Sequence, residues 1–351
     1  MAKKSCLIFM ILTAMVTRSF ADSGIVPFAV PFYTPETSVG GAASMLYYYD
    51  DDNDRVRPDT ISFVALYTIN NQMLFAMVGN KYFNDDEFLA GIKIAYSSFP
   101  KKFYGIGNKS RYSDEEQYDP VNVSMQSWLQ NRIFADTYAG IIYSFGRYEI
   151  AEYEENGIID TGEFYGIQPG YASGIGIRVD HDTRENRFNP QDSTYITLSS
   201  ICYNEYTGSD FHYNHVNLDA RYYKNIYRHH VIATQLYIEN TDGNPPLQVI
   251  PELGGQNVMR GYYQGRYKDS SYMAWQMEYR SPYWGRLGLV VFGGVGEVAK
   301  SMKDYCAANI KYSGGAGIRF VVQNNRKIAF RLDVGLSPED MGVYFNLLHA
   351  F

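Results

Sequence analysis

A glycine-rich stretch from residue 254 to residue 262 carries a single cation, Arg260. The stretch reads Gly-Gly-Gln-Asn-Val-Met-Arg-Gly-Tyr, with neither the alternation of a strand nor the period of a helix. A guanidinium is always charged and presents a planar fork of donors, which suits it to hold a carboxylate. Because the flanking segments alternate, the stretch is predicted to be a long loop, with its arginine either solvated or turned into a pore.

Two other groups of polar residues could suggest chemistry, and their spacing argues against it. His212 and His215 are three residues apart, so on a strand they face opposite sides and cannot easily share a metal ion. His181 lies between Asp180 and Asp182 and faces away from both. A barrel enzyme would need a serine with a convergent histidine and acid, which the sequence does not display. We therefore predict no enzyme, no cofactor and no metal site.

The segments that must position these residues alternate with a period of two. Residues 139–146, 174–180 and 315–322 each present one apolar face and one face rich in glycine and polar or charged residues. Aromatic residues make up 16% of the chain, and no run after residue 21 reaches the roughly 18 apolar residues of a membrane helix. This combination favours an all-β transmembrane antiparallel barrel, with aromatic girdles and a polar lumen, over a soluble secreted β-protein.

The first residues predict export. Lys3 and Lys4 precede an apolar run from Leu7 to Val16, and Ser19-Phe20-Ala21 provides a small-x-small cleavage site. We therefore assign residues 1–21 to a signal peptide, which takes no part in the fold.

The expected mature chain, residues 22–351, is predicted to be one outer-membrane barrel, because no linker or charge block divides it. Of the 31 basic residues, three fall in the signal peptide, so 28 remain against 38 acidic residues, a net charge of −10. This charge gives no electrostatic case for nucleic acid. Only Cys202 and Cys306 remain after cleavage, and whether they pair stays open.

Sixteen strands are predicted. Fifteen strand-like runs can be identified in the mature chain, but a barrel with both termini in the periplasm needs an even number. Counting back from the end places the 241–269 loop outside the cell and the 182–190 turn inside, so the missing strand lies near the N-terminus. We assign it to residues 24–33, where Pro27 and Pro31 each remove a ladder donor and predict weak pairing.

Four motifs follow one another in the second half of the chain. They are the turn from Val179 to Arg184 with Phe188-Asn189-Pro190, which contains Asp180, Asp182, Arg184 and Pro190; the loop tip Val258, Met259, Arg260, Gly261 and Tyr262; the runs Ser313–Arg319 and Arg331–Asp333; and the last strand, 341–351, with Val343, Phe345, Leu347 and Phe351. Together they resemble the surface-antigen superfamily of outer-membrane proteins, the BamA/TamA group. In that group the last strand carries the barrel-assembly signal, and the loop tip has a valine where this chain has Met259.

The resemblance implies that the 241–269 loop folds into the lumen and that Arg260 contacts acids on the inner barrel wall. Glu278 corresponds to the first of two such acids. The second belongs to a Phe-x-Asp-x-Gly motif, in which this chain has Gly294 in place of the aspartate. We therefore expect one acidic partner instead of two, and a loop that is less firmly pinned.

The resemblance also implies a barrel-only branch of the superfamily, because residues 22–38 are too few for the periplasmic POTRA domains of longer members. We predict a non-enzymatic outer-membrane barrel of a Gram-negative bacterium, related to protein-assembly and translocation insertases. It would act as a pore or as a membrane-remodelling scaffold that perturbs lipid or opens at the seam between the first and last strands.

The alternative is a passive porin-like channel or a structural subunit of a larger envelope complex. Expected partners are outer-membrane lipid, the barrel-assembly machinery, and other envelope proteins or further copies of this chain. The client or solute, the oligomeric state and a separate periplasmic partner stay open.

Overall fold

The computed structural model of this chain describes residues 23–34, 38–49, 58–69, 71–162, 164–324 and 326–351. The expected signal peptide, residues 1–21, lies outside this part of the chain. Within it, no helix has the length and hydropathy to span a bilayer.

The architecture is one antiparallel meander in which each long strand pairs with its neighbours along the chain. Sixteen long strands form the ladders of the described residues, which agrees with the prediction. The strands are β1 (Ser23–Thr34), β2 (Ser38–Tyr49), β3 (Asp59–Thr68), β4 (Met73–Phe83), β5 (Phe88–Ser98), β7 (Glu116–Phe134), β8 (Thr137–Tyr153), β9 (Gly170–Asp182), β10 (Ser193–Tyr203), β11 (His212–Tyr227), β12 (His230–Asn244), β15 (Ser271–Arg280), β16 (Leu287–Ala299), β17 (Lys311–Gln323), β18 (Ile328–Leu336) and β19 (Met341–Leu347).

In the part of the chain that the structure describes, three shorter strands, one short α-helix and five 3-10 helices lie in the connections. Strand β6 (Lys101–Phe103) extends the ladder on β7, and β13 (Glu252–Leu253) pairs with β14 (Tyr267–Lys268) as a separate hairpin. Helix α1 (Ile158–Thr161) lies between β8 and β9.

The two faces of the wall reverse the pattern of a soluble β-protein. Outward side chains such as Ile141 and Ile177 are 57% and 63% exposed, whereas the inward Arg331 and Asp333 are 1% and 0% exposed. A sandwich in water would bury the isoleucines and solvate the charges. An apolar outer face around a charged interior is the arrangement of a transmembrane β-barrel, because lipid replaces water outside the wall.

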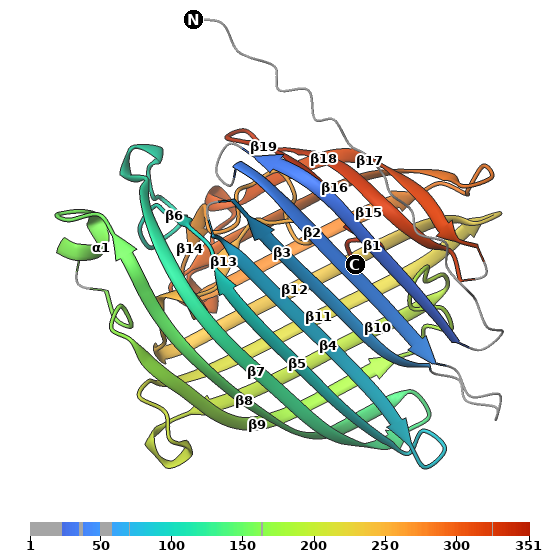
Figure 1. Cartoon of the computed structure of the whole chain (residues 1–351), viewed down its shortest axis with the longest axis horizontal. Coiled ribbons are helices and arrows are strands. Elements are labelled where there is room, and N and C mark those ends of the chain that lie inside the picture. The colour runs from blue at the N-terminus through green and yellow to red at the C-terminus, as the bar shows by residue number, and fades with distance from the viewer. Residues whose placement is uncertain (1–22, 35–37, 50–57, 70, 163, 325) are drawn as a thin grey trace, which may run out of the picture.

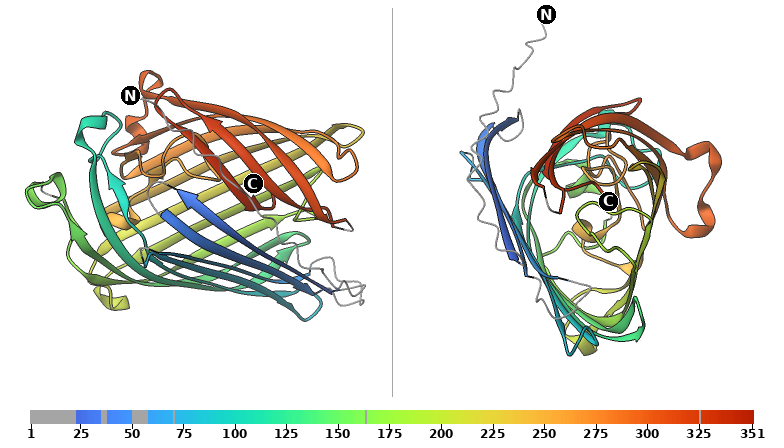
Figure 2. Two further views of the ribbon diagram at one scale, coloured as in Figure 1. Left: turned by 45° about the horizontal axis from the view of Figure 1, so that its top comes forward. Right: turned by 90° about the vertical axis from the view of Figure 1, so that its right-hand side faces the viewer.

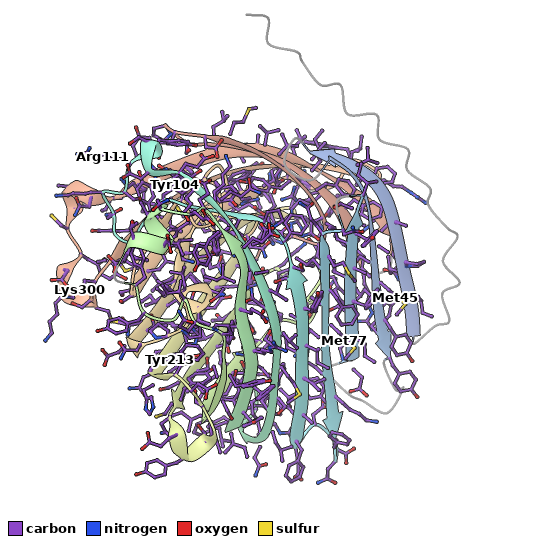
Figure 3. The ribbon with its side chains drawn as sticks, turned by 60° about the vertical axis from the view of Figure 1, so that its left-hand side comes forward. Met45, Met77, Tyr104, Arg111, Tyr213 and Lys300 are labelled. Carbon is purple, nitrogen blue, oxygen red and sulfur yellow. The ribbon has the colours of Figure 1, made fainter. Side chains whose placement is uncertain are left out.

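Antiparallel alternation sorts the connections to two ends. The long connections 99–115, 154–169 and 245–270 lie at one end, here called the loop end, at the left of Figure 1 where β6, β13, β14 and α1 are drawn. Short connections such as 135–136 lie at the other end, here called the turn end. Figure 3 shows Tyr104, Arg111 and Lys300 in the loop-end connections.

The first and last strands form the two edges of the meander. Strand β1 pairs with β2 over its whole length, so the weak pairing expected from Pro27 and Pro31 is not found on that side. In the described residues no ladder joins β1 to β19, and the two edges stand apart in both views of Figure 2. Side chains bridge the seam near the turn end instead. The Gln323 amide donates to the Tyr48 hydroxyl at 2.8 Å, and Val26 packs in one cluster with Ile328.

Candidate functional site

The connection between β12 and β15, residues 245–270, turns back into the barrel. Its side chains Leu253 and Met259 are fully buried, and they pack with Tyr272 and Val298 of the wall. A loop hanging in solvent would not bury its apolar side chains in this way. Because the packing partners come from β15 and β16, the loop is seated against the last third of the wall.

Arg260, at the tip of this loop, is held by two carboxylates from different strands. One guanidinium nitrogen donates to Glu278 of β15 at 2.7 Å, and another donates to Asp333 of β18 at 2.5 Å. The guanidinium carbon lies 3.5 Å from the centre of the Phe292 ring. All three charged side chains have no solvent exposure, so these charge-assisted bonds act in a low-dielectric surrounding.

The backbone at the tip approaches the wall closely enough to require glycine. Gly261 has φ of +114°, and a Cβ there would lie 2.7–2.8 Å from the main chain of Leu336. Across the contact, a Cβ on Gly335 would lie 2.7 Å from the Arg260 carbonyl carbon. The Gly261 amide donates to the Tyr344 hydroxyl at 2.9 Å. The tip is therefore attached to β18 and β19 by backbone contacts as well as by charge.

The expectation of a single acidic partner is wrong. Asp333 supplies the second carboxylate, because Arg331 and Asp333 alternate with outward apolar residues and so face the lumen. At Gly294, a Cβ would lie 3.3 Å from the Met259 sulfur and 2.9 Å from the Gln276 Cβ. Met259 thus occupies the space into which an aspartate at position 294 would extend.

Further arginines contact the two acids directly or lie beside them. The Arg280 Nε donates to Glu278 at 2.8 Å, and an Arg319 nitrogen lies 2.5 Å from Asp333. Arg331, 1% exposed, donates to the Asn257 side chain of the loop at 3.1 Å. With four arginines facing two carboxylates, the cluster holds excess positive charge. Each acid is paired with more than one guanidinium, so this cluster can hold the loop tip against the barrel wall.

The end of the chain also enters the lumen, which corrects the predicted strand 341–351. Strand β19 stops at Leu347, and Leu348 has φ of +71°. Phe351 is 4% exposed and packs with Tyr223 of β11, while its main-chain oxygen accepts from Arg280 at 2.6 Å. Of the other predicted assembly-signal residues, Val343 points outward at 53% exposure, and Phe345 packs against Phe330.

The predicted turn motif folds across the turn end. Asp182 pairs with Arg184 at 2.8 Å and with Arg187 at 3.0 Å, and Asp180 pairs with Arg178 at 2.7 Å. These short-range pairs hold the 183–192 connection inward. Two further residues of this connection, Phe188 and Pro190, are buried, and Phe188 packs against the Tyr48 ring. The Asn186 side chain donates to the Arg326 carbonyl at 2.8 Å.

A polar cavity of 1120 Å³ lies in the barrel between the inward loop and this turn. Its wall includes Lys93 of β5, Arg221 of β11 and Glu239 of β12, together with loop residues 254–258 and turn residues 187–188. His215, predicted not to share a metal with His212, lies 3.0 Å from Glu239. The cavity is wide enough for a small hydrophilic solute.

At the loop end a second set of contacts, which the sequence did not predict, anchors the base of the loop. Arg266 lies over the rings of Tyr104 and Tyr112, each 4.7 Å away, and pairs with Glu339 at 2.8 Å. The segment 103–108 is held by the Gly107 amide, which donates to the Lys268 carbonyl at 2.7 Å. No sequence signal marks these contacts, because they join connections that are far apart in the sequence, such as those of Ser110 and Arg266 with a separation of 156 residues.

Glu252 joins the same two connections through ion pairs. Its carboxylate lies 3.3 Å from the Lys101 ammonium and 2.8 Å from that of Lys268. Burial alone would raise the pKa of Glu252, but Lys101 and Lys268 outweigh it and lower this pKa to about 2. The carboxylate is therefore charged at neutral pH.

An apolar outer wall, a charged lumen and an inward loop fastened by a buried arginine define a transmembrane β-barrel with a loop folded into its lumen. The sequence profile of the Omp85 superfamily domain matches residues 57–326, and the chain belongs to the Omp85 superfamily. This membership confirms the predicted resemblance. No curated protein sequence matches the chain.

The solved structures that are similar in fold include one BamA and two CdiB proteins. BamA from Haemophilus ducreyi lacking POTRA domains 1–3 aligns with a TM-score of 0.57 and 11% identity, over 97% of this chain and 74% of that one. CdiB from Acinetobacter baumannii aligns with a TM-score of 0.59 and 11% identity, over 97% of this chain and 65% of that one. CdiB from Escherichia coli aligns with a TM-score of 0.59 and 9% identity, over 98% of this chain and 67% of that one. At such identities the likeness is one of fold.

Proposed function

We propose that this chain is a non-enzymatic barrel of the Gram-negative outer membrane, in which the 245–270 loop is a plug that must move for the barrel to work. Its role would be that of a pore or membrane-remodelling scaffold of the insertase and translocator type. The observation that carries the proposal is Arg260, which is completely buried between Glu278 and Asp333 on two strands of the inner wall.

This fastening suits a plug because it is strong and local. The contacts of the tip fall on β15, β16, β18 and β19, next to the seam where no ladder joins β1 to β19 in the described residues. Release of Arg260 would free the lumen and remove the tip from the β18–β19 hairpin in one step. A plug that also fastens an edge would couple lumen opening to a change at the seam.

Planar-bilayer recording of the purified full chain tests the proposal. Arg260→Ala is expected to give a larger or noisier conductance than the parent, since the plug tip then loses both of its ion pairs with the inner wall. Arg111→Ala is the matched control, because Arg111 is an exposed arginine in another loop-end connection. Equal traces from the parent and from both variants would reject the plug.

A passive channel is the second candidate, and the polar cavity of 1120 Å³ favours it. This candidate predicts a steady open conductance in the parent protein, unchanged when the first and last strands are cross-linked through engineered cysteines. A scaffold that works through its seam predicts that the same cross-link abolishes its function in cells. The effect of the cross-link therefore distinguishes the two candidate functions.

A further inference from the structure

The outer wall carries an apolar trough that no part of the lumen site uses. It is a cavity of 720 Å³ on the lipid-facing side of β2 to β9. Its lining includes three small residues of neighbouring strands, Gly79 of β4, Ala90 of β5 and Ser127 of β7. Larger outward residues such as Ile61 and Ile141, 43% and 57% exposed, stand on either side.

Strand register shows that the trough is a built feature of the outer surface. Paired residues run across the wall in a row, from Ile61 to Gly79, Ile92, Ser127 and then Tyr143. A second row pairs Lys81 with Ala90, Ala90 with Leu129, and Leu129 with Ile141. Because paired residues share a face, Gly79 and Ser127 are both diagonal neighbours of Ala90, and the three small residues leave a groove between the bulky ones.

Two opposite charges line the trough toward the turn end. Lys81 lies two residues before the end of β4, and Asp59 is the first residue of β3. The Asp59 carboxylate is fixed by the Tyr82 amide, which donates to it at 2.8 Å. The Lys81 ammonium lies over the Phe83 ring at 5.2 Å, and no carboxylate of the described residues pairs with it. The trough therefore offers a cation, an anion and an apolar channel in one place.

We propose that this trough binds one phospholipid with a zwitterionic, primary-amine head group. The phosphate would pair with Lys81, the head-group ammonium with Asp59, and one acyl chain would lie over Gly79, Ala90 and Ser127. An anionic lipid without an amine would satisfy Lys81 but place its charge beside Asp59. The proposal rests on the transmembrane wall alone, so it stands or falls independently of the plug.

Native mass spectrometry of the delipidated full chain, titrated with phosphatidylethanolamine or phosphatidylglycerol, tests the site. The parent is expected to retain one phosphatidylethanolamine and to bind it about fivefold more tightly than phosphatidylglycerol, the ratio expected for one favourable exposed ion pair. Lys81→Ala should weaken both lipids, and Asp59→Asn should remove the preference while keeping an acceptor for the Tyr82 amide. Equal binding of the two lipids by the parent would overturn the proposal.

A filled trough supplies the decisive variant. A Cβ on Gly79 would meet Ile92 at 3.6 Å and Ile61 at 3.9 Å, ordinary contacts, so Gly79→Leu fits the wall and occupies the trough. It should bind phosphatidylethanolamine about tenfold more weakly or worse. Gly41→Leu is the control, since Gly41 lies on the outer face of β2 away from the trough, with nothing within 4 Å of its Cβ. Both variants should keep the heat-modifiable gel mobility of a folded barrel. If the two bind the lipid equally, the trough is not the site.

Discussion

Loss of the Arg260 side chain should release the loop tip by a predictable amount. In Arg260→Ala, Glu278 keeps Arg280 at 2.8 Å and Asp333 keeps Arg319 at 2.5 Å, so neither carboxylate is left unpaired. Breaking a buried ion pair costs about 3–5 kcal/mol when the remaining charge is uncompensated. With both acids still engaged, that cost does not apply, and the loss of the two charge-assisted hydrogen bonds of Arg260, at about 1.5 kcal/mol each, gives about 3 kcal/mol, or about a 150-fold larger population of the released loop.

Thiol labelling measures that population. Met259 has no solvent exposure, so a Met259→Cys reporter should react with a maleimide only when the tip leaves the wall. The background carries Cys202→Ser and Cys306→Ser, because both native thiols are exposed. In the fast-opening regime the labelling rate follows the open population, so Arg260→Ala should label about 150-fold faster than the reporter protein. Arg111→Ala should label at the reporter's rate.

A double-mutant cycle shows whether Asp333 acts on Arg260 directly. Asp333→Asn alone should also accelerate labelling, since it leaves the four arginines facing Glu278 as the one carboxylate of the cluster. In the double variant the change in the free energy of loop opening should be smaller than the sum of the two single changes, with a coupling of about 1–3 kcal/mol. Additive effects, within about 0.5 kcal/mol, would refute the contact between Arg260 and Asp333 as the fastening of the loop.

Three further perturbations test other parts of the same structure. Gly335→Ala places a Cβ 2.7 Å from the Arg260 carbonyl carbon, so it should speed reporter labelling without touching a charge; a rate equal to the parent's would contradict the close backbone approach. Gly294→Asp alone should lower the temperature at which the heat-modifiable band is lost, whereas Gly294→Asp with Met259→Val should be better tolerated, because the smaller side chain vacates the space next to position 294. The pKa of Glu252 is lowered to about 2, so its contribution to anchoring the loop is complete above its ordinary pKa and is lost as pH falls toward 2. Conductance noise should therefore rise between pH 4.5 and pH 2 in the parent, and Glu252→Gln should show that noise already at pH 7; a quiet Glu252→Gln channel at neutral pH would contradict this anchor.

The wall was predictable because its physics is local. Alternation of apolar residues with glycine and charge assigns each side chain to lipid or lumen without knowledge of any partner strand. Strand β1 could be predicted from parity alone, since an uneven number of strands cannot bring both termini to one end. The residue at which a strand ends depends on its partner strand as well as on its own sequence. Leu347 pairs with Phe330 two residues after β18 begins, so residues 349–351 have almost no ladder left to join and turn to Arg280 and Tyr223 instead.

The lumen contacts depend on register across distant strands, which a single sequence does not display. Glu278 could be assigned from its motif, whereas Asp333 had to be located by knowing that β18 lies two strands beyond β16 and faces the loop tip. Met259 and Gly294 illustrate the same limit. Each is an isolated departure from the family pattern in the sequence, yet in the folded barrel a Cβ at 294 would lie 3.3 Å from the Met259 sulfur, so the two departures occupy one space. The larger side chain fits because the wall residue is small, and Asp333 of β18 supplies the second acid for Arg260. The loop is therefore pinned by two acids, with one of them supplied from a different strand.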